Sequence, residues 1–166
     1  MKFRISYFYQ IRNFKKNMVP MSTAMWDPAW YHAGLGPDHI YTDKRGILNG
    51  LRLKPIIVQG NTLHTCPCEN KDPEHCITMK EYRQELDKIN FENMLAGIRA
   101  FADRYKKINK IDEEIIMVLI VYEIPSNKCS ERQTLINYFN DNGVECKELD
   151  YPIDNPVSFK NEPFDF

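Results

Sequence analysis

The stretch Ile115-Ile116-Met117-Val118-Leu119-Ile120-Val121 is apolar at every position. Successive side chains of a β-strand point to opposite faces of the sheet, so a strand that is apolar throughout must be covered on both faces. That is the position of a central strand in an α/β sheet. The segment therefore predicts a sheet with a packed layer on each side.

Further strands are predicted on either side of this segment in the sequence. Residues Phe3 to Ile11 and Met18 to Met21 are rich in aromatic, β-branched and other apolar residues, which indicates two strands. Leu53 to Val58 predicts a third, at a sheet edge because Pro55 lacks an amide proton. The first of these segments alternates in the manner of a half-buried strand, with Phe3, Ile5, Tyr7 and Tyr9 on one face.

Three helices are predicted in the second half of the chain. Thr78 with Glu81 has the spacing of a capping box, which predicts a helix to about Lys88. Asn90 is a suitable cap for a helix over 91–108, where apolar residues recur every three or four positions. Ser130 with Gln133 forms a second capping box, and Gly143 suits a left-handed residue at the end of that helix.

The order of these elements predicts the fold class. After the last helix, 144–149 reads as a strand parallel to the apolar one, which completes a strand–helix–strand unit. We expect a three-layer, Rossmann-like α/β sandwich with a mostly parallel sheet and a long irregular insertion after Ser22. The predicted organisation is a single domain over 1–150, including a Cys/His-rich loop at 61–77, followed by a tail at 151–166.

Composition excludes several classes of protein. With 166 residues, 43% of them hydrophobic and 27% charged, the chain can bury a core and is not disordered. Its net charge of −1 disfavours a nucleic-acid-coating protein. No apolar run reaches the roughly 18 residues of a membrane span. Because the N-terminus lacks the apolar core of an export signal, we expect a cytoplasmic protein.

The loop between the apolar strand and the last helix carries the first candidate site, because ligands bind beyond the carboxyl ends of the strands in such sheets. Arg132 and Ser130 are candidate ligand-binding residues for an anion, Cys129 a candidate nucleophile and Glu123 a candidate acid or base. The alternative is structural: Ser130 only caps the helix, Cys129 is buried, and Arg132 pairs with Glu123.

A second candidate site lies in the insertion, which is dense in aromatic residues. These side chains are typical of a wall that stacks on a planar ligand, with a carboxylate to recognise a hydroxyl or amine. The alternative is a local core that holds the long loop in place. The candidate ligand-binding residues here are Ser22, Trp26, Asp27, Trp30 and Tyr31.

A third pattern indicates a metal. Thiolates and imidazoles cluster between residues 64 and 76, in a loop with few apolar residues to hold it. Such ligands favour a structural zinc ion in tetrahedral geometry. The alternative is a reduced loop without a metal. The candidate ligands are His64, Cys66, Cys68 and Cys76.

The sequence VYEIPSNKCSER, from Val121 to Arg132, resembles the YE…P…CHR signature of a bacterial and phage family catalogued as domain of unknown function 488. The resemblance covers mainly 115–143 and implies an N-terminal strand followed by a hydrophobic strand that ends in this motif before a helix. The histidine of that signature corresponds to Ser130 or Glu131 here. The resemblance supports the fold and the position of a site rather than a reaction.

These observations give two hypotheses about function. The first is a small cytoplasmic protein that binds a small anionic, nucleotide-like ligand at the carboxyl ends of the strands, with catalysis left open. The alternative is a non-enzymatic inhibitor or sequestering protein of phage type that acts on a host protein or a nucleotide signal. A homo-oligomer with the zinc loop at its interface is a third, structural hypothesis.

Overall fold

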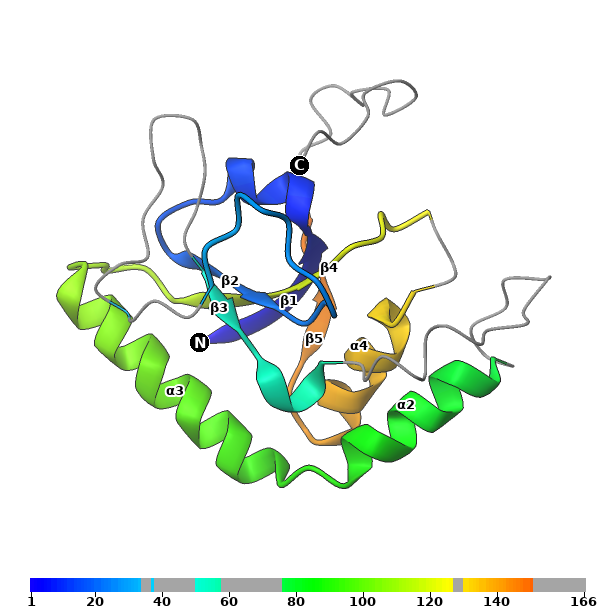
Figure 1. Cartoon of the computed structure of the whole chain (residues 1–166). Helices are drawn as coiled ribbons and strands as arrows, with labels where there is room; N and C mark the ends of the chain where they lie inside the picture. The colour runs from blue at the N-terminus through cyan, green and yellow to red at the C-terminus, as the bar shows by residue number, and fades with distance from the viewer. Residues whose placement is uncertain (34–36, 38–49, 58–75, 127–129, 151–166) are drawn as a thin grey trace, which may run out of the picture.

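A computed structural model of the chain describes residues 1–33, 37, 50–57, 76–126 and 130–150. Their centre is a 5-stranded sheet in which every pair of neighbouring strands is parallel (Figure 1). The strand order is β3-β2-β4-β1-β5, so the apolar segment forms a central strand, as its sequence predicts. The strands are β1 (Lys2–Tyr7), β2 (Met18–Ser22), β3 (Leu51–Arg52), β4 (Ile116–Val121) and β5 (Cys146–Glu148).

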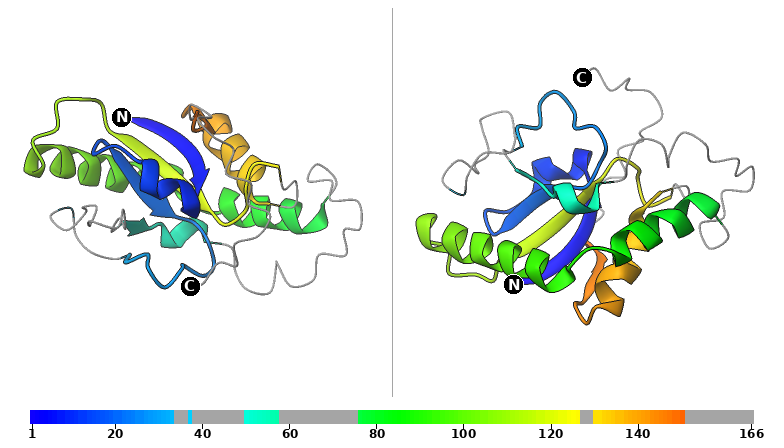
Figure 2. Two further views of the ribbon diagram at one scale, coloured as in Figure 1. Left: turned by 90° about the horizontal axis from the view of Figure 1, so that it is seen from above. Right: turned by 60° about the horizontal axis from the view of Figure 1, so that its bottom comes forward.

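The two faces of the sheet are covered differently (Figures 1 and 2). Helices α2 (Ile77–Asp87), α3 (Phe91–Ile108) and α4 (Arg132–Asp141) all pack on one face. The other face is covered by the 3-10 helix η1 (Phe8–Asn13) and by the segment 24–33. The three-layer α/β fold is thus confirmed, with a third layer made of a short 3-10 helix and irregular chain.

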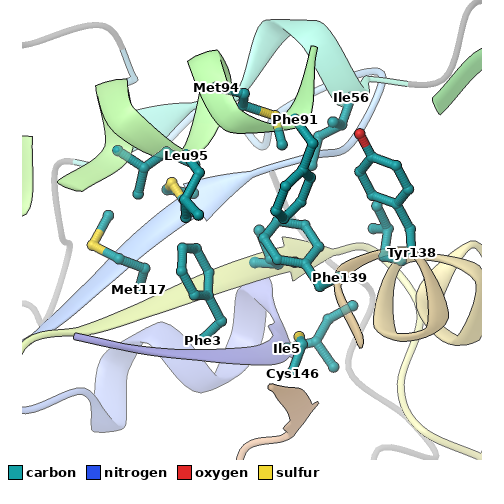
Figure 3. Close-up of a cluster of buried hydrophobic side chains, with 14 of the residues drawn as sticks. Phe3, Ile5, Ile56, Phe91, Met94, Leu95, Met117, Tyr138, Phe139 and Cys146 are labelled. Atoms are coloured by element: carbon teal, nitrogen blue, oxygen red, sulfur yellow. The ribbon is translucent and has the colours of Figure 1, made fainter. Parts of the chain in front are cut away.

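Strand β4 contributes to both hydrophobic cores, as its continuous apolarity requires. Met117 and Leu119 point to the α-helical face, and Val118 and Ile120 point to the face of η1. Figure 3 shows the larger core, where Phe3 of β1 lies against Phe139 of α4 with ring centroids 5.0 Å apart. All four of these β4 side chains are fully buried.

Two strand predictions need correction. The first strand ends at Tyr7, and Phe8–Asn13 forms η1 instead of continuing the strand to Ile11. The reason is that Phe8 and Ile11 are both buried in the second core. A 3-10 helix places residues three apart on one face, whereas a strand would place these two on opposite faces.

The third predicted strand lies earlier in the chain than expected. Strand β3 covers only Leu51–Arg52, and Lys54–Ile56 forms the short 3-10 helix η3. Pro55 fits the first turn of that helix, where an amide proton has no helical partner. β3 nevertheless stands at the edge of the sheet, as expected.

The helix ends confirm some of the predicted caps and correct others. The Asn90 side chain accepts a hydrogen bond from the amide of Asn93 at 3.0 Å, as predicted. Gly143 has φ +79°, and the amide of Val144 donates to the carbonyl of Phe139, which closes the predicted left-handed helix end.

Neither predicted capping box forms. Helix α2 starts at Ile77, one residue before Thr78, and Thr78 is buried in its first turn. Gln133 donates to Asn137 at 2.8 Å rather than reaching back to the helix start. At the start of α4, the Ser130 hydroxyl instead accepts from the amide of Arg132 at 3.2 Å, so Ser130 contacts the first turn without the reciprocal bond of a capping box.

Gly50 is required by close packing. A Cβ at this position would lie 2.1 Å from the Tyr31 hydroxyl oxygen and 2.8 Å from Cγ of Pro20. Because Tyr31 is buried, we expect Gly50→Ala to lower the free energy of unfolding by about 2 kcal/mol in urea denaturation. Gly97→Ala is the control, since a Cβ there meets nothing within 4 Å, and should stabilise α3 by about 0.5–1 kcal/mol. Equal effects in the two variants would contradict this packing argument.

Candidate functional site at the carboxyl edge of the sheet

At the carboxyl edge of the sheet, neighbouring strands are followed by connections that run to opposite faces of the sheet. The chain leaves β1 and β2 towards the face of η1, but leaves β4, their neighbour in the sheet, towards the face of α4. In open α/β sheets, ligands bind where connections from adjacent strands part in this way. The fold therefore places the predicted loops at the position where a ligand site is expected.

Buried polar side chains gather at this edge. They lie at the ends of β1 and β2 and around the start of α4, where burying polar groups costs free energy unless they are paired or used. Thr78 lies elsewhere, in the first turn of α2. The buried polar residues at the edge are Ser6, Ser22, Thr23, Ser130, Glu131 and Arg132.

One group of polar side chains, the β2–β3 cluster, consists of Ser22, Asp27 and Arg52. The Ser22 hydroxyl donates to the Asp27 carboxylate, and Arg52 donates to the other oxygen of that carboxylate at 3.0 Å. Arg52 also donates to the carbonyl of Ala24 at 3.2 Å. The carboxylate of Asp27 is thus held in one orientation by two donors.

The predicted aromatic wall divides into a core part and an exposed part. Tyr31 and Trp30 both pack edge-on against Phe8, with ring centroids 5.3 and 6.1 Å away, so they hold the loop in place. The Tyr31 hydroxyl donates to the carbonyl of Leu51 at 2.6 Å. By contrast, 72% of Trp26 is exposed, next to Asp27 in the chain. Trp26 is thus the most exposed of these three rings.

Tyr122 is an aromatic residue at this edge that the sequence analysis did not select. It follows β4 directly, contacts Phe8 with ring centroids 5.1 Å apart, and is 41% exposed. Burial raises the pKa of its phenol, and so does the negative charge of Asp27 nearby. Tyr122 thus connects the β2–β3 cluster with the end of β4.

A second group, the α4 cluster, consists of Glu123, Ser130, Glu131, Arg132 and Glu148. Arg132 is only 6% exposed, and its guanidinium donates to both carboxylate oxygens of Glu148, at 2.9 and 2.8 Å. It also donates to the backbone carbonyl of Glu123. Because β1 lies between β4 and β5, Arg132 joins the strands on either side of β1.

This geometry favours the structural interpretation of Arg132. Both terminal nitrogens of its guanidinium are engaged, with Glu148 and with the Glu123 carbonyl, whereas its Nε–H has no partner in the described part of the chain. A phosphate would have to displace these contacts to be clamped by the planar fork. The predicted pairing with Glu123 is realised through the backbone of that residue.

The other members of the α4 cluster surround a pair of carboxyl groups. The Ser130 hydroxyl donates to Glu123 at 3.2 Å and accepts from the Arg132 amide at 3.2 Å. Glu131 is 5% exposed, and burial, the charge of Glu123 and a hydrogen bond with Glu123 raise its pKa to about 8. The sequence analysis did not select Glu131. The one signal for it is that the histidine of the resembled signature corresponds to Ser130 or Glu131 in this sequence.

Several predicted residues lie outside the described ranges. These are the candidate nucleophile Cys129, the candidate zinc ligands His64, Cys66 and Cys68, and the predicted tail 151–166. Cys76, the fourth candidate ligand, is buried at the start of α2. Within the described ranges, no group of three His, Cys, Asp or Glu side chains is arranged to hold a metal ion. The zinc site stays a prediction.

Among the described residues, the two clusters hold four carboxyl groups and two arginines. Asp27 is paired with Arg52 and Glu148 with Arg132, which leaves the Glu123–Glu131 pair as the unbalanced acidic group.

In the described part of the chain, no helix is both long enough and apolar enough to span a bilayer. No protein-family profile, curated protein or solved structure matches the chain.

Proposed function

We propose that the protein binds a small, planar, polar ligand of nucleoside type at the carboxyl edge of its sheet. The observation that supports this most is the gathering of buried polar side chains at that edge, next to exposed aromatic rings. Elsewhere in the described part of the chain, the buried residues are almost all apolar. Buried polar groups at strand ends are a common property of ligand sites in α/β proteins.

The β2–β3 cluster and its aromatic neighbour supply the contacts. Trp26 would stack on the planar part of the ligand, because its indole is largely exposed. Asp27, held by Ser22 and Arg52, would accept a hydrogen bond from a hydroxyl or amino group of the ligand. Tyr122 offers a second ring at the same edge.

The charge of the site favours a neutral or cationic ligand over an anion. Both arginines of the two clusters are engaged by carboxylates and carbonyls, so neither is a free anchor for phosphate. The unbalanced charge of the carboxyl pair is negative. A ligand of the nucleotide-like shape expected from the sequence would therefore be held through its base and sugar rather than through a phosphate group.

Tryptophan fluorescence tests this proposal, because Trp26 and Trp30 are the only two tryptophans and only Trp26 is largely exposed. We expect nucleosides to quench the emission at least as strongly as their monophosphates. Trp26→Ala should weaken binding, measured by calorimetry, by about tenfold, since stacking on one base contributes roughly 1–3 kcal/mol. The control is Ile77→Ala, another exposed apolar side chain, which lies at the start of α2.

Two outcomes would overturn the proposal. One is the absence of binding by every nucleoside and nucleotide tested. The other is binding that is equally strong in Trp26→Ala and wild type. Either result would favour the alternative of a protein that acts through a macromolecular partner. Asp27→Asn provides a second variant, in which we expect about tenfold weaker binding without loss of the fold.

A further inference from the structure

The Asp27 carboxylate keeps part of its hydrogen-bonding capacity for a ligand. Ser22 donates to one of its oxygens and Arg52 to the other, and these two are its donors among the described residues. A carboxylate oxygen accepts two hydrogen bonds, so one acceptor position remains on each oxygen. The Asp27 side chain is 12% exposed, so the group is not closed off from solvent. Asp27 can therefore accept two further hydrogen bonds, one on each oxygen.

Arg52 fixes this carboxylate in place. Its Nη1 donates to Asp27, while its Nη2 donates to the carbonyls of Ala24 at 3.2 Å and Met25 at 2.5 Å. The guanidinium thus joins the segment 24–27 to β3 through three contacts. A carboxylate in an ion pair with arginine carries no proton, so it acts as an acceptor only. Asp27 therefore attracts ligand groups that donate hydrogen bonds and repels groups that accept them.

Exposed aromatic rings adjoin this carboxylate. Trp26 precedes Asp27 in the chain and is 72% exposed. The amide and the hydroxyl of Thr23 both donate to the carbonyl of Ile120 at 3.0 Å, which joins the end of β4 to the segment that leads to Asp27. Tyr122 follows two residues later, and burial and the nearby charge of Asp27 raise the pKa of its phenol. A base that stacks on one of these rings would present its hydrogen-bonding edge to the carboxylate.

We propose that Asp27 makes the site selective for guanine among the nucleobases. Guanine carries two adjacent donors on one edge, the ring N–H and the exocyclic amine, and each would donate to one oxygen of Asp27 in a bidentate pair. Adenine and cytosine place a ring-nitrogen acceptor beside their amine, and that acceptor would face a carboxylate oxygen. Uracil and hypoxanthine offer a single donor on the corresponding edge. This inference rests on the proposed function, because it names the base that the same site takes.

Calorimetry of the full-length protein with guanosine, inosine and adenosine tests this selectivity. Inosine is guanosine without the exocyclic amine, so the two nucleosides differ by one donor at the edge that faces Asp27. We expect guanosine to bind about tenfold more tightly than inosine, because inosine lacks the hydrogen bond from that amine to a charged acceptor. Adenosine should bind more weakly still, because its ring acceptor would leave the carboxylate oxygen without a donor.

The variant Asp27→Asn assigns the selectivity to this side chain. The amide keeps the shape but replaces one acceptor with a donor, so the ratio of guanosine to inosine affinity should fall to about one. Asp87→Asn is the matched control, since Asp87 is also paired with an arginine, Arg83 at 2.9 Å, but its side chain is 54% exposed on α2. That variant should keep the wild-type ratio. Circular dichroism verifies the fold of both variants, and the ratio in the wild type decides should Asp27→Asn not fold.

The outcomes distinguish this inference from the proposed function. Equal binding of guanosine and inosine by the wild type would overturn guanine selectivity and leave nucleoside binding untouched. Weaker binding of dideoxyguanosine, which lacks both ribose hydroxyls, together with that equality would mean that Asp27 contacts the sugar instead of the base. A guanosine preference that persists in Asp27→Asn would overturn the role of Asp27. No binding of any of these nucleosides would overturn the proposed function itself.

Discussion

Arg132→Met is expected to lower the free energy of unfolding by about 2–3 kcal/mol, because the acceptors of a buried arginine lose their donor. Arg132 is 6% exposed and is bound through two nitrogens to Glu148 and to the carbonyl of Glu123. Methionine fills much of the volume but leaves that carbonyl and the carboxylate of Glu148 without their donor. Urea denaturation at neutral pH measures the difference.

A surface ion pair provides the matched control for Arg132. Lys88 and Glu85 are joined at 2.6 Å, but their side chains are 69% and 57% exposed. Lys88→Met should therefore change stability by less than about 0.5 kcal/mol. Should Arg132→Met cost no more than Lys88→Met, Arg132 would not hold the strands together, and its guanidinium would be available to bind an anion after all.

The main features of the fold follow from local sequence patterns. The unbroken apolarity of 115–121 requires cover on both faces of the strand, and β4 contributes to both cores. The spacing of apolar residues over 91–108 predicts the bounds of α3 and its buried face, except that Ile108 at the end of the helix is 41% exposed. Gly143 takes the left-handed conformation that ends α4. In each case the deciding interactions lie within one element, so a sequence window contains them.

The candidate site was only partly predictable because its contacts are long-range. Arg132 and Glu148 are 16 residues apart, and no motif connects a residue of α4 with one at the end of β5. The partial burial of Trp30 likewise depends on Phe8, which comes from η1. The position of the site at the strand ends was predictable from topology, but the partners of its side chains were not.

Glu131 illustrates the same limit. A glutamate at a helix start is usually an exposed residue that interacts with the helix dipole. Here the neighbourhood of α2 and the carboxyl group of Glu123 remove it from water, and neither is visible in the local sequence. The consequence is a buried acid whose titration should affect the stability of the whole protein.

We expect wild-type stability to fall steadily between about pH 5 and pH 8, by roughly 1.4 kcal/mol per pH unit where the slope is steepest. Burial and the charge of Glu123 raise the pKa of Glu131 from 4.5 to about 8 in the folded protein. Between these values the folded state binds a proton that the unfolded chain has lost, so raising the pH favours unfolding. Thermal unfolding monitored by circular dichroism across this range measures the slope.

Glu131→Gln should remove most of this slope, because an amide cannot ionise, and the variant should exceed the wild type in stability near pH 8. A residual slope of the same sign comes from Glu148, whose pKa is also raised by burial. Glu145→Gln is the control, since the Glu145 side chain is 70% exposed and its loss should leave the slope unchanged. Glu114, whose pKa is lowered by hydrogen bonds from the N-terminal amine and Lys2, affects stability only as the pH falls below about 4.5. It therefore does not interfere above pH 5. A wild-type stability that stays level or rises from about pH 5 to pH 8 would contradict this prediction, because it would mean that Glu131 is ionised in the folded protein over that range.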